Sequence, residues 1–197
     1  MKADSSTAFK PQVERTQRGF SLIECMISMA ILTIGLLSLL GVFGIAMATT
    51  QTSQENNTAK QLANEAMEGI LTARETANIS WAQINNTGSG GIFLPGFQPI
   101  YNAGVDGIIG TADDQASGFQ TLEIPGSSGI FAGTCPPDNC VTLTNFQRQI
   151  TISPVFPVGG GAAYTTLRSV TITVQYTTPQ NSIPRQYVLS SYISTFR

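Results

Sequence analysis

Histidine is absent from this 197-residue chain. Its absence removes the side chain most often used as a general base, the usual nitrogen ligand of zinc and every Ser-His catalytic triad. Charged residues are also scarce, at 11%, whereas about 25% is typical of globular domains. The net charge is −2, so no basic field attracts nucleic acid, and the sequence shows no nucleic-acid-binding motif. We therefore predict that the chain is not an enzyme.

Cysteine is rare as well, with three residues in two different settings. Cys135 and Cys140 enclose the short loop C-P-P-D-N-C, whereas Cys25 lies in a long apolar stretch. This spacing predicts one local disulfide between Cys135 and Cys140, formed in an oxidising compartment such as the periplasm. Two free thiols or half of a metal site are the alternatives. Zinc is disfavoured because the chain has neither histidine nor a second cysteine pair of this kind.

Apolar residues, by contrast, are concentrated at residues 18–49, R-G-F-S-L-I-E-C-M-I-S-M-A-I-L-T-I-G-L-L-S-L-L-G-V-F-G-I-A-M-A-T. After Arg18 this stretch holds a single charge, Glu24. Its length exceeds the roughly 20 residues that cross a bilayer as a helix. A carboxylate at the centre of a membrane costs about 2.5–3.5 kcal/mol. We therefore expect Glu24 to have a functional reason for its position.

The segment R-G-F-S-L-I-E, residues 18–24, followed by an apolar helix, resembles the class III leader and N-terminal helix of type IV pilins and of the pseudopilins of type II secretion. The resemblance implies that a prepilin peptidase cuts between Gly19 and Phe20, that Phe20 is then N-methylated, and that Glu24 stays in the mature helix. The closing segments 169–177 and 185–194 are similar to the end of minor pilins of the PilV type and of the I-type pseudopilin. The resemblance thus implies a minor type IV pilin that initiates or modifies a filament used for motility, adhesion or DNA uptake.

Charge pairing gives a physical reason for Glu24. Cleavage would leave a positively charged amine on Phe20 in apolar surroundings, and pairing two buried charges offsets much of the cost of burying either one. If subunits stack with a small axial offset, Glu24 of one subunit neutralises the Phe20 amine of its neighbour and sets the register between them. The alternative is that Glu24 lies at the level of the lipid head groups, as charged residues near helix ends often do.

The sequence predicts three regions. Residues 1–19 form a leader with more basic than acidic side chains, so the positive-inside rule keeps it in the cytoplasm and sends the C-terminal part across the inner membrane. Residues 20–49 form the transmembrane and assembly half of a helix, and residues 50–197 form a periplasmic globular domain. An ordinary secretory signal cut after Ala48 is the alternative, but the apolar run is about twice the usual 7–15 residues.

Helical periodicity continues beyond the apolar stretch and predicts one helix over roughly residues 20–77. Small and apolar residues recur at three- and four-residue spacing on one face of its second half: Ala59, Leu62, Ala63, Ala66, Met67, Ile70, Ala73 and Ala77. Alternating patterns predict strands at 146–153, 165–177 and 186–195, with shorter strands near 91–94 and 119–124. Arg148 shares the apolar face of its strand, so it must lie at a rim or be paired. The expected fold is α+β, a long N-terminal helix packed on a C-terminal antiparallel sheet.

An aspartate- and glycine-rich stretch, Y-N-A-G-V-D-G-I-I-G-T-A-D-D-Q, occupies residues 101–115. Its glycines let the backbone fold so that the carboxylates of Asp106, Asp113 and Asp114 converge, and Ca²⁺ takes six to eight such oxygens. The stretch is similar to a calcium loop of some pilins and of the major pseudopilin, which implies Ca²⁺ as a cofactor with these three aspartates as ligands. The alternative is a pair of solvated turns, since Asp and Gly favour turns without an ion.

Two other functions remain compatible with the sequence. A minor pseudopilin of a type II secretion system shares the leader and the helix, and no residue separates it from a minor pilin. A single-pass anchored protein with a periplasmic binding or sensor domain would keep its leader and would not need Glu24. The pilin hypothesis expects three partners, namely other pilins through the N-terminal helix, the prepilin peptidase and, before assembly, the inner membrane.

Overall fold

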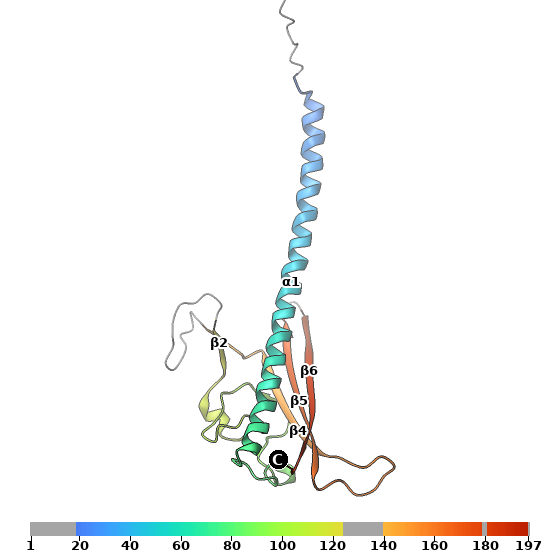
Figure 1. Cartoon of the computed structure of the whole chain (residues 1–197). Coiled ribbons are helices and arrows are strands. Elements are labelled where there is room, and N and C mark those ends of the chain that lie inside the picture. Colours follow the sequence, from blue (N-terminus) through green and yellow to red (C-terminus); the bar gives the residue numbers. More distant parts are fainter. Residues whose placement is uncertain (1–18, 124–139, 179–180, 197) are drawn as a thin grey trace, which may run out of the picture. The chain divides into compact units, whose positions relative to one another are not determined.

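The computed structural model describes residues 19–123, 140–178 and 181–196. In chain order the elements are α1 (Leu22–Glu75), the 3-10 helix η1 (Thr87–Ser89), β1 (Gln98–Pro99), the 3-10 helix η2 (Asp114–Ser117), β2 (Thr121–Glu123), β3 (Cys140–Thr142), β4 (Phe146–Pro154), β5 (Leu167–Thr178) and β6 (Asn181–Ser194). The chain forms two compact units, one ending at Met47 and the other beginning at Ala48. The layout is α+β, which confirms the predicted fold class (Figure 1).

In the first unit, the residues of α1 up to Met47 are exposed and almost all apolar. Among the described residues, α1 is the one helix that is long and apolar enough to cross a membrane. Its hydroxyl groups bond to the helix itself: Ser28 donates to the Glu24 carbonyl (2.8 Å), Thr33 to Ala30 (2.8 Å) and Ser38 to Ile34 (2.9 Å). These polar groups are therefore satisfied without water, as an apolar environment demands.

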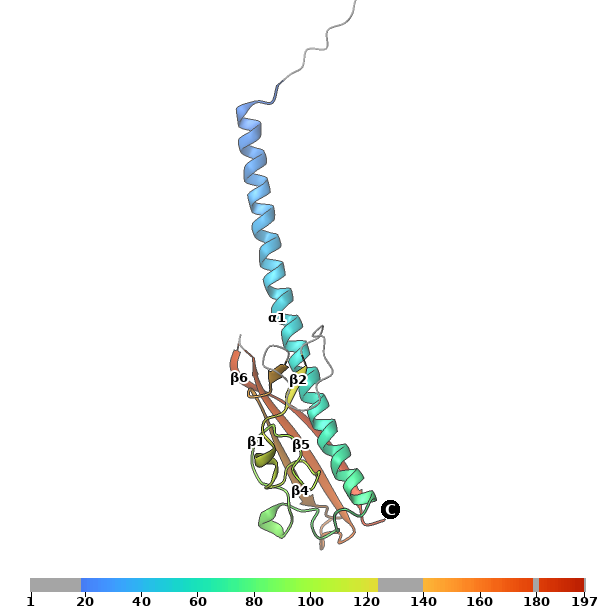
Figure 2. The ribbon, with the colours of Figure 1, turned by 90° about the vertical axis from the view of Figure 1, so that its left-hand side faces the viewer.

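In the second unit, the later turns of α1 pack on the sheet, as both views show (Figures 1 and 2). The buried face consists of Ala59, Leu62, Ala63, Ala66, Met67, Ile70 and Ala73. These positions match the face predicted from the spacing, apart from Ala77. Ala59, Ala63 and Ala66 are each completely buried. Their small side chains bring the helix backbone close to the strands.

Ala77 was predicted to continue the buried face, but α1 ends at Glu75 and Ala77 is exposed. Ala77 has a φ of 58°, which is left-handed backbone. The Ile79 amide then donates back to the Ala73 carbonyl at 3.2 Å, and Ile79 is buried. The spacing continues to Ala77 because alanine is not one of the residues, glycine or asparagine, that usually mark the left-handed end of a helix.

The main sheet has the order β1-β4-β5-β6 with antiparallel neighbours. Its register places Ile150 opposite Ile172, and Ile172 opposite Leu189. Side chains on one face alternate with exposed ones and form the core together with α1: Phe146, Ile150, Ile152, Val170, Ile172, Val174, Tyr176 and Ile193. This confirms the three long strands that the alternation predicted.

Two of the strand predictions differ from the structure, and a third is confirmed. The segment 91–94 forms no strand, and Phe93 makes only an isolated bridge to Asn86. The short strand predicted near 119–124 is confirmed as β2, which pairs with β3 in a separate two-stranded sheet. β6 begins at Asn181 instead of 186, because a strand at the edge of a sheet tolerates a proline such as Pro184.

Asn86 holds the loop region against the sheet. β1 pairs with the Gln147–Arg148 part of β4, and among the described residues no strand lies beside the next part of that edge. There the Asn86 side chain donates to the Ile150 carbonyl (2.8 Å) and accepts from the Ile152 amide (2.9 Å). One side-chain amide thus provides the two hydrogen bonds that a neighbouring strand would otherwise make.

Candidate functional site

The peptide bond predicted to be cleaved lies in non-helical chain. Gly19, Phe20 and Ser21 precede α1, and Phe20 is 82% exposed. The Ser21 carbonyl accepts from the amides of Glu24 (3.0 Å) and Cys25 (3.3 Å), which closes the first helical turn. The Gly19–Phe20 bond therefore stands outside the helix, where a peptidase has access to the backbone. The other residues of the predicted leader, 1–18, lie outside the described part.

Glu24 lies in the first turn of α1. The helix dipole favours a negative charge there by typically 0.3–1 kcal/mol, which offsets part of the cost of a carboxylate in an apolar segment. The side chain is exposed and has no hydrogen bond or ion pair with another described residue. Any partner of the Glu24 carboxylate therefore comes from outside the described part of the chain. Pairing with the Phe20 amine of a neighbouring subunit stays a prediction.

Asp106, Asp113 and Asp114 converge in the structure, with one carboxylate oxygen from each lying within 4.8 Å of the others. Asp106 Oδ1 accepts from the Ile108 amide (2.8 Å), and Asp113 Oδ2 accepts from the Asp106 amide (3.2 Å). Thr111 Oγ1 donates to Asp113 Oδ1 at 2.6 Å. The hydrogen bonds from Thr111 and from the Asp106 amide hold the pKa of Asp113 below its usual value. The loop residues themselves thus keep the acidic groups together.

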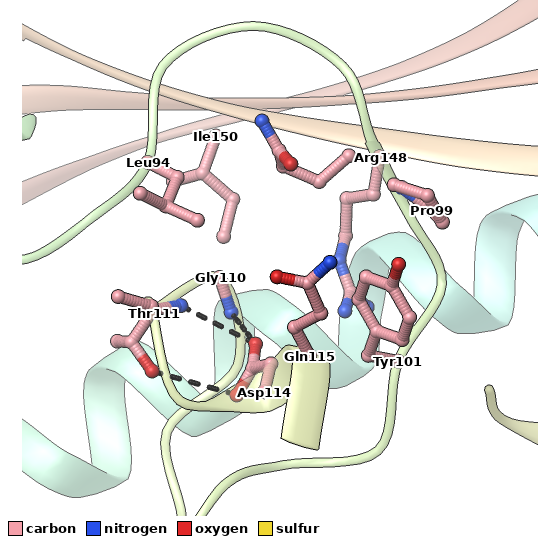
Figure 3. A pocket seen from close by; sticks show the side chains of 11 residues that line it. Leu94, Pro99, Tyr101, Gly110, Thr111, Asp114, Gln115, Arg148 and Ile150 are labelled. Atoms are coloured by element: carbon pink, nitrogen blue, oxygen red, sulfur yellow. Dashed lines mark hydrogen bonds between the residues drawn. The ribbon is translucent and has the colours of Figure 1, made fainter. Parts of the chain in front are cut away.

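Asp114 differs from the other two aspartates because it is buried, with 4% exposure. Its carboxylate accepts from the backbone amides of Gly104 (2.9 Å), Gly110 and Thr111 (3.3 Å), and Figure 3 shows the last two contacts. Burial raises the pKa of Asp114, while these hydrogen bonds and the charge of Arg148 act in the opposite direction. One carboxylate therefore joins three points of the loop and anchors it from within.

Two glycines allow this loop to close. A Cβ at Gly104 would lie 2.2 Å from Asp113 Oδ2, and a Cβ at Gly110, whose φ is +94°, would lie 2.5 Å from Ile150 Cδ1. The three carboxylates retain acceptor capacity beyond these amide bonds, because an ionised carboxylate offers about four lone-pair sites. The arrangement fits a hard cation such as Ca²⁺, with Asp106 and Asp113 as the more accessible ligands. Whether Ca²⁺ binds stays a prediction.

Arg148 is paired rather than placed at a rim. It lies in β4 with 4% exposure, and its Nη1 donates to the Leu62 carbonyl of α1 at 3.3 Å. The same nitrogen is 3.9 Å from Glu65 Oε2. Burial lowers the pKa of Arg148 to about 10, and the negative charges of Glu65 and Asp114 oppose that shift. The sequence signal for this site was a lone charge on an apolar strand face, which indicated a partner without identifying it.

Gln120 extends this contact. Its Nε2 donates to both oxygens of Glu65, at 3.1 and 3.3 Å. The polar link therefore runs from the loop before β2, through α1, to Arg148 in β4. No sequence pattern indicated Gln120, because its partner lies 55 positions away along the chain.

Only one of the two cysteines of the predicted disulfide belongs to the described residues. Cys140 begins β3 and is buried, whereas Cys135 lies outside the described residues. The pairing of Cys135 with Cys140 therefore stays a prediction. Cys25, on α1, is a free and exposed cysteine.

Comparison with protein families gives one finding. Residues 15–40 match the family described as the prokaryotic N-terminal methylation motif. The match includes Gly19, Phe20 and Glu24 and ends within α1. No curated protein and no solved structure matches the chain. The motif, together with the long apolar helix behind it, supports a type IV pilin-like or pseudopilin-like protein.

Proposed function

We propose that the chain is a minor type IV pilin, of the PilV type, that initiates or modifies a filament serving motility, adhesion or DNA uptake. The observation that carries this proposal is the methylation motif at residues 15–40, continuous with a helix whose apolar side chains are exposed up to Met47. A prepilin peptidase cuts between Gly19 and Phe20, Phe20 is methylated, and the helix then packs with those of other pilins. Before assembly the helix lies in the inner membrane and the globular part in the periplasm.

The exposed apolar half of α1 suits a subunit that moves from the lipid of a membrane into a filament of packed helices. An apolar surface of this kind must be covered, either by lipid or by neighbouring helices. Glu24 is the one charge of the helix up to Met47, and it has no partner among the described residues. In a filament, the Phe20 amine of an adjacent subunit supplies that partner and sets the axial position of each new subunit.

The processing step is tested by the intact mass and N-terminal residue of the protein isolated from its native membrane. The expected product begins with N-methylated Phe20 and lacks residues 1–19. A protein that still begins with Met1 indicates the anchored binding or sensor protein, and one that begins at Thr49 indicates an ordinary secretory signal. Either of these results contradicts the pilin proposal.

The assembly step is tested with Glu24→Leu, which leaves the cleavage motif around Gly19 in place. We expect normal processing but at least about a tenfold loss of the variant from the sheared filament fraction. The reason is that Glu24→Leu would leave the Phe20 amine of the neighbouring subunit as an unpaired buried charge, which costs about 3–5 kcal/mol. The matched control is Ser28→Ala, one turn later, which removes only a hydrogen bond to the Glu24 carbonyl. Wild-type incorporation of the Glu24 variant would show that the carboxylate is not needed for assembly.

A minor pseudopilin of type II secretion is the second candidate, and the same methylation motif supports it. Deletion of the gene separates the two. Loss of surface filaments with normal release of exported enzymes favours the pilin. Loss of enzyme release with normal filaments favours the pseudopilin and contradicts the pilus assignment.

We also propose that residues 101–115, here called the aspartate loop, bind Ca²⁺ through Asp106, Asp113 and Asp114, on the basis of their convergence within 4.8 Å. Calorimetric titration of the full chain in detergent with CaCl₂ is expected to show one saturable site. Asp106→Asn and Asp113→Asn should weaken it at least about tenfold, since each removes one charge from the ligand set. Glu75→Gln, at an exposed position of α1, is the control. No saturable heat in the wild-type protein would contradict the proposal.

A further inference from the structure

A pocket of about 290 Å³ lies between the aspartate loop and β4, and neither Asp106 nor Asp113 is among the residues that line it (Figure 3). Arg148 and Ile150 of β4 and Gln98 of β1 form part of its wall, and Tyr101 and Gln115 belong to the loop. Its volume lies just below the roughly 300–1,000 Å³ found for pockets of drug-sized ligands. The pocket therefore has room for one small ring rather than an extended molecule.

Arg148 brings unused hydrogen-bond donors to this pocket. The side chain reaches from β4 to a position between Gln115 and Tyr101 (Figure 3). Its guanidinium carries five N–H groups, and Nη1 alone has a partner among the described residues. None of the Arg148 nitrogens is a fully buried donor without a partner, so its remaining N–H groups are open to solvent in the pocket. Acceptor atoms of a bound molecule could take the place of water there.

The charges around Arg148 determine what kind of acceptor fits. Glu65 lies 3.9 Å from the guanidinium, and the charge of Asp114 also acts on it. These two carboxylates compensate the positive charge, so an anion gains little by entering. A cation would face the guanidinium directly. The electrostatics therefore favour a neutral ligand with oxygen acceptors.

The other polar groups add both donors and acceptors. The Gln115 amide and the Tyr101 hydroxyl make no hydrogen bond to another described residue, and Gln98 uses only its Nε2, which donates to the Pro95 carbonyl. The Tyr101 ring is held by stacking on Phe119, with ring centroids 5.0 Å apart. Leu94 and Ile150 complete the wall with apolar surface. A hydroxyl group both donates and accepts, so a ring bearing several hydroxyls matches this mixture.

We propose that this pocket binds one neutral sugar residue, with Arg148 and Gln115 bonding its hydroxyls and Tyr101 bordering its ring. The site gives the globular part of the chain a carbohydrate ligand, independently of how the N-terminal helix assembles. Its residues are distinct from the processing motif, so the binding test does not depend on the function proposed above.

The test uses the full chain in a deuterated phosphocholine detergent, since glycoside detergents would compete for the pocket. The probes are the methyl glycosides of glucose, galactose, mannose, N-acetylglucosamine and N-acetylgalactosamine, with glucuronate and acetate as anionic comparators. Saturation-transfer NMR is followed by titration. We expect saturable binding of at least one neutral glycoside, with a Kd of about 1 mM or tighter, which corresponds to about −4 kcal/mol.

Two variants localise the ligand. Gln115→Ala and Tyr101→Leu should each weaken binding at least about tenfold, whereas Gln147→Ala, on the exposed face of β4, should leave the Kd unchanged. Circular dichroism of each variant checks that the fold is kept. The proposal is overturned if none of the five glycosides binds saturably, if glucuronate or acetate binds more tightly than every neutral sugar, or if both pocket variants bind as the wild type does.

Discussion

Arg148 shows how one buried charge is tolerated. Its partner Glu65 is 41% exposed at the side chain and Arg148 only 4%, so the cost of burial falls mainly on the arginine. Removing one member of an ion pair is costly where it leaves the other charge buried, but Arg148→Met leaves only the solvent-accessible Glu65 without its partner. We therefore expect Arg148→Met to leave the free energy of unfolding within about 1 kcal/mol of the wild type, or to raise it.

Glu65→Gln should have a larger effect than Arg148→Met. It keeps the shape of the side chain but leaves the guanidinium without its nearest negative charge, and we expect a loss of about 1–2 kcal/mol. Denaturant unfolding of the full chain in detergent measures both variants. In the double variant the cost of Glu65→Gln should disappear, because no buried charge then remains beside it. Equal costs in the single and double variants would show that the two residues are not coupled.

We predict that a side chain at Gly104 destabilises the protein for a steric reason. Gly104→Ala places a Cβ against the Asp113 carboxylate, which must then leave its bonds with Thr111 and the Asp106 amide. We expect a loss of about 1–2 kcal/mol in unfolding free energy, together with weaker Ca²⁺ binding if the loop is a calcium site. Gly88→Ala is the control, since a Cβ there meets nothing within 4 Å. An unchanged stability for Gly104→Ala would mean that the carboxylate moves at no cost.

At the scale of elements, the edge of β4 depends on Asn86. Asn86→Ala leaves the Ile152 amide and the Ile150 carbonyl without the side-chain partner that they have now. We expect a loss of about 2 kcal/mol, with faster hydrogen exchange at the Ile152 amide. Asn85→Ala, which removes one exposed hydrogen bond to Ser89, should change stability by less than about 0.5 kcal/mol. Unchanged exchange at Ile152 would contradict the role given to Asn86.

The end of α1 offers a stabilising substitution. Ala77 has left-handed backbone, which costs an L-residue roughly 1–2 kcal/mol but costs glycine little. After allowing for the greater freedom of glycine in the unfolded chain, Ala77→Gly should raise the unfolding free energy by about 0.5–1 kcal/mol. The comparison is Gln61→Gly, at an exposed position inside α1, which should lose about 1 kcal/mol. A destabilised Ala77→Gly variant would argue against this backbone conformation.

At the scale of the whole molecule, the oxidation state of the cysteines shows whether the globular part of the chain has reached an oxidising compartment. If the globular part is exported, alkylation of the denatured but unreduced protein should label only Cys25, and reduction should then expose two more thiols, for three labels in all. Cys140→Ser should give two labelled cysteines before reduction, because Cys135 loses its partner. Counting the added mass on the intact protein distinguishes these outcomes. Three labels on the unreduced wild type would rule out the disulfide.

Much of this fold is determined by local sequence. The unbroken apolar run and the spacing of Leu62, Ala66 and Ile70 predict α1 and its buried face, because a helix repeats its environment every 3.6 residues. Alternation predicts β4, β5 and most of β6 for the corresponding reason, since successive strand residues point to opposite faces. The glycine and aspartate content of 101–115 similarly predicts a loop whose carboxylates converge.

The tertiary structure alone decided which distant groups meet. β1 has two residues, too few for any alternating pattern, and exists because Gln98 and Pro99 lie beside β4. Asn86 resembles every other asparagine in the turn-rich region until its amide reaches the edge of β4. The surroundings of Arg148 come from α1, β4 and the aspartate loop together. Periodicity records whether a residue is buried, but the identity of its neighbours depends on how separate elements pack, and no local pattern contains that information.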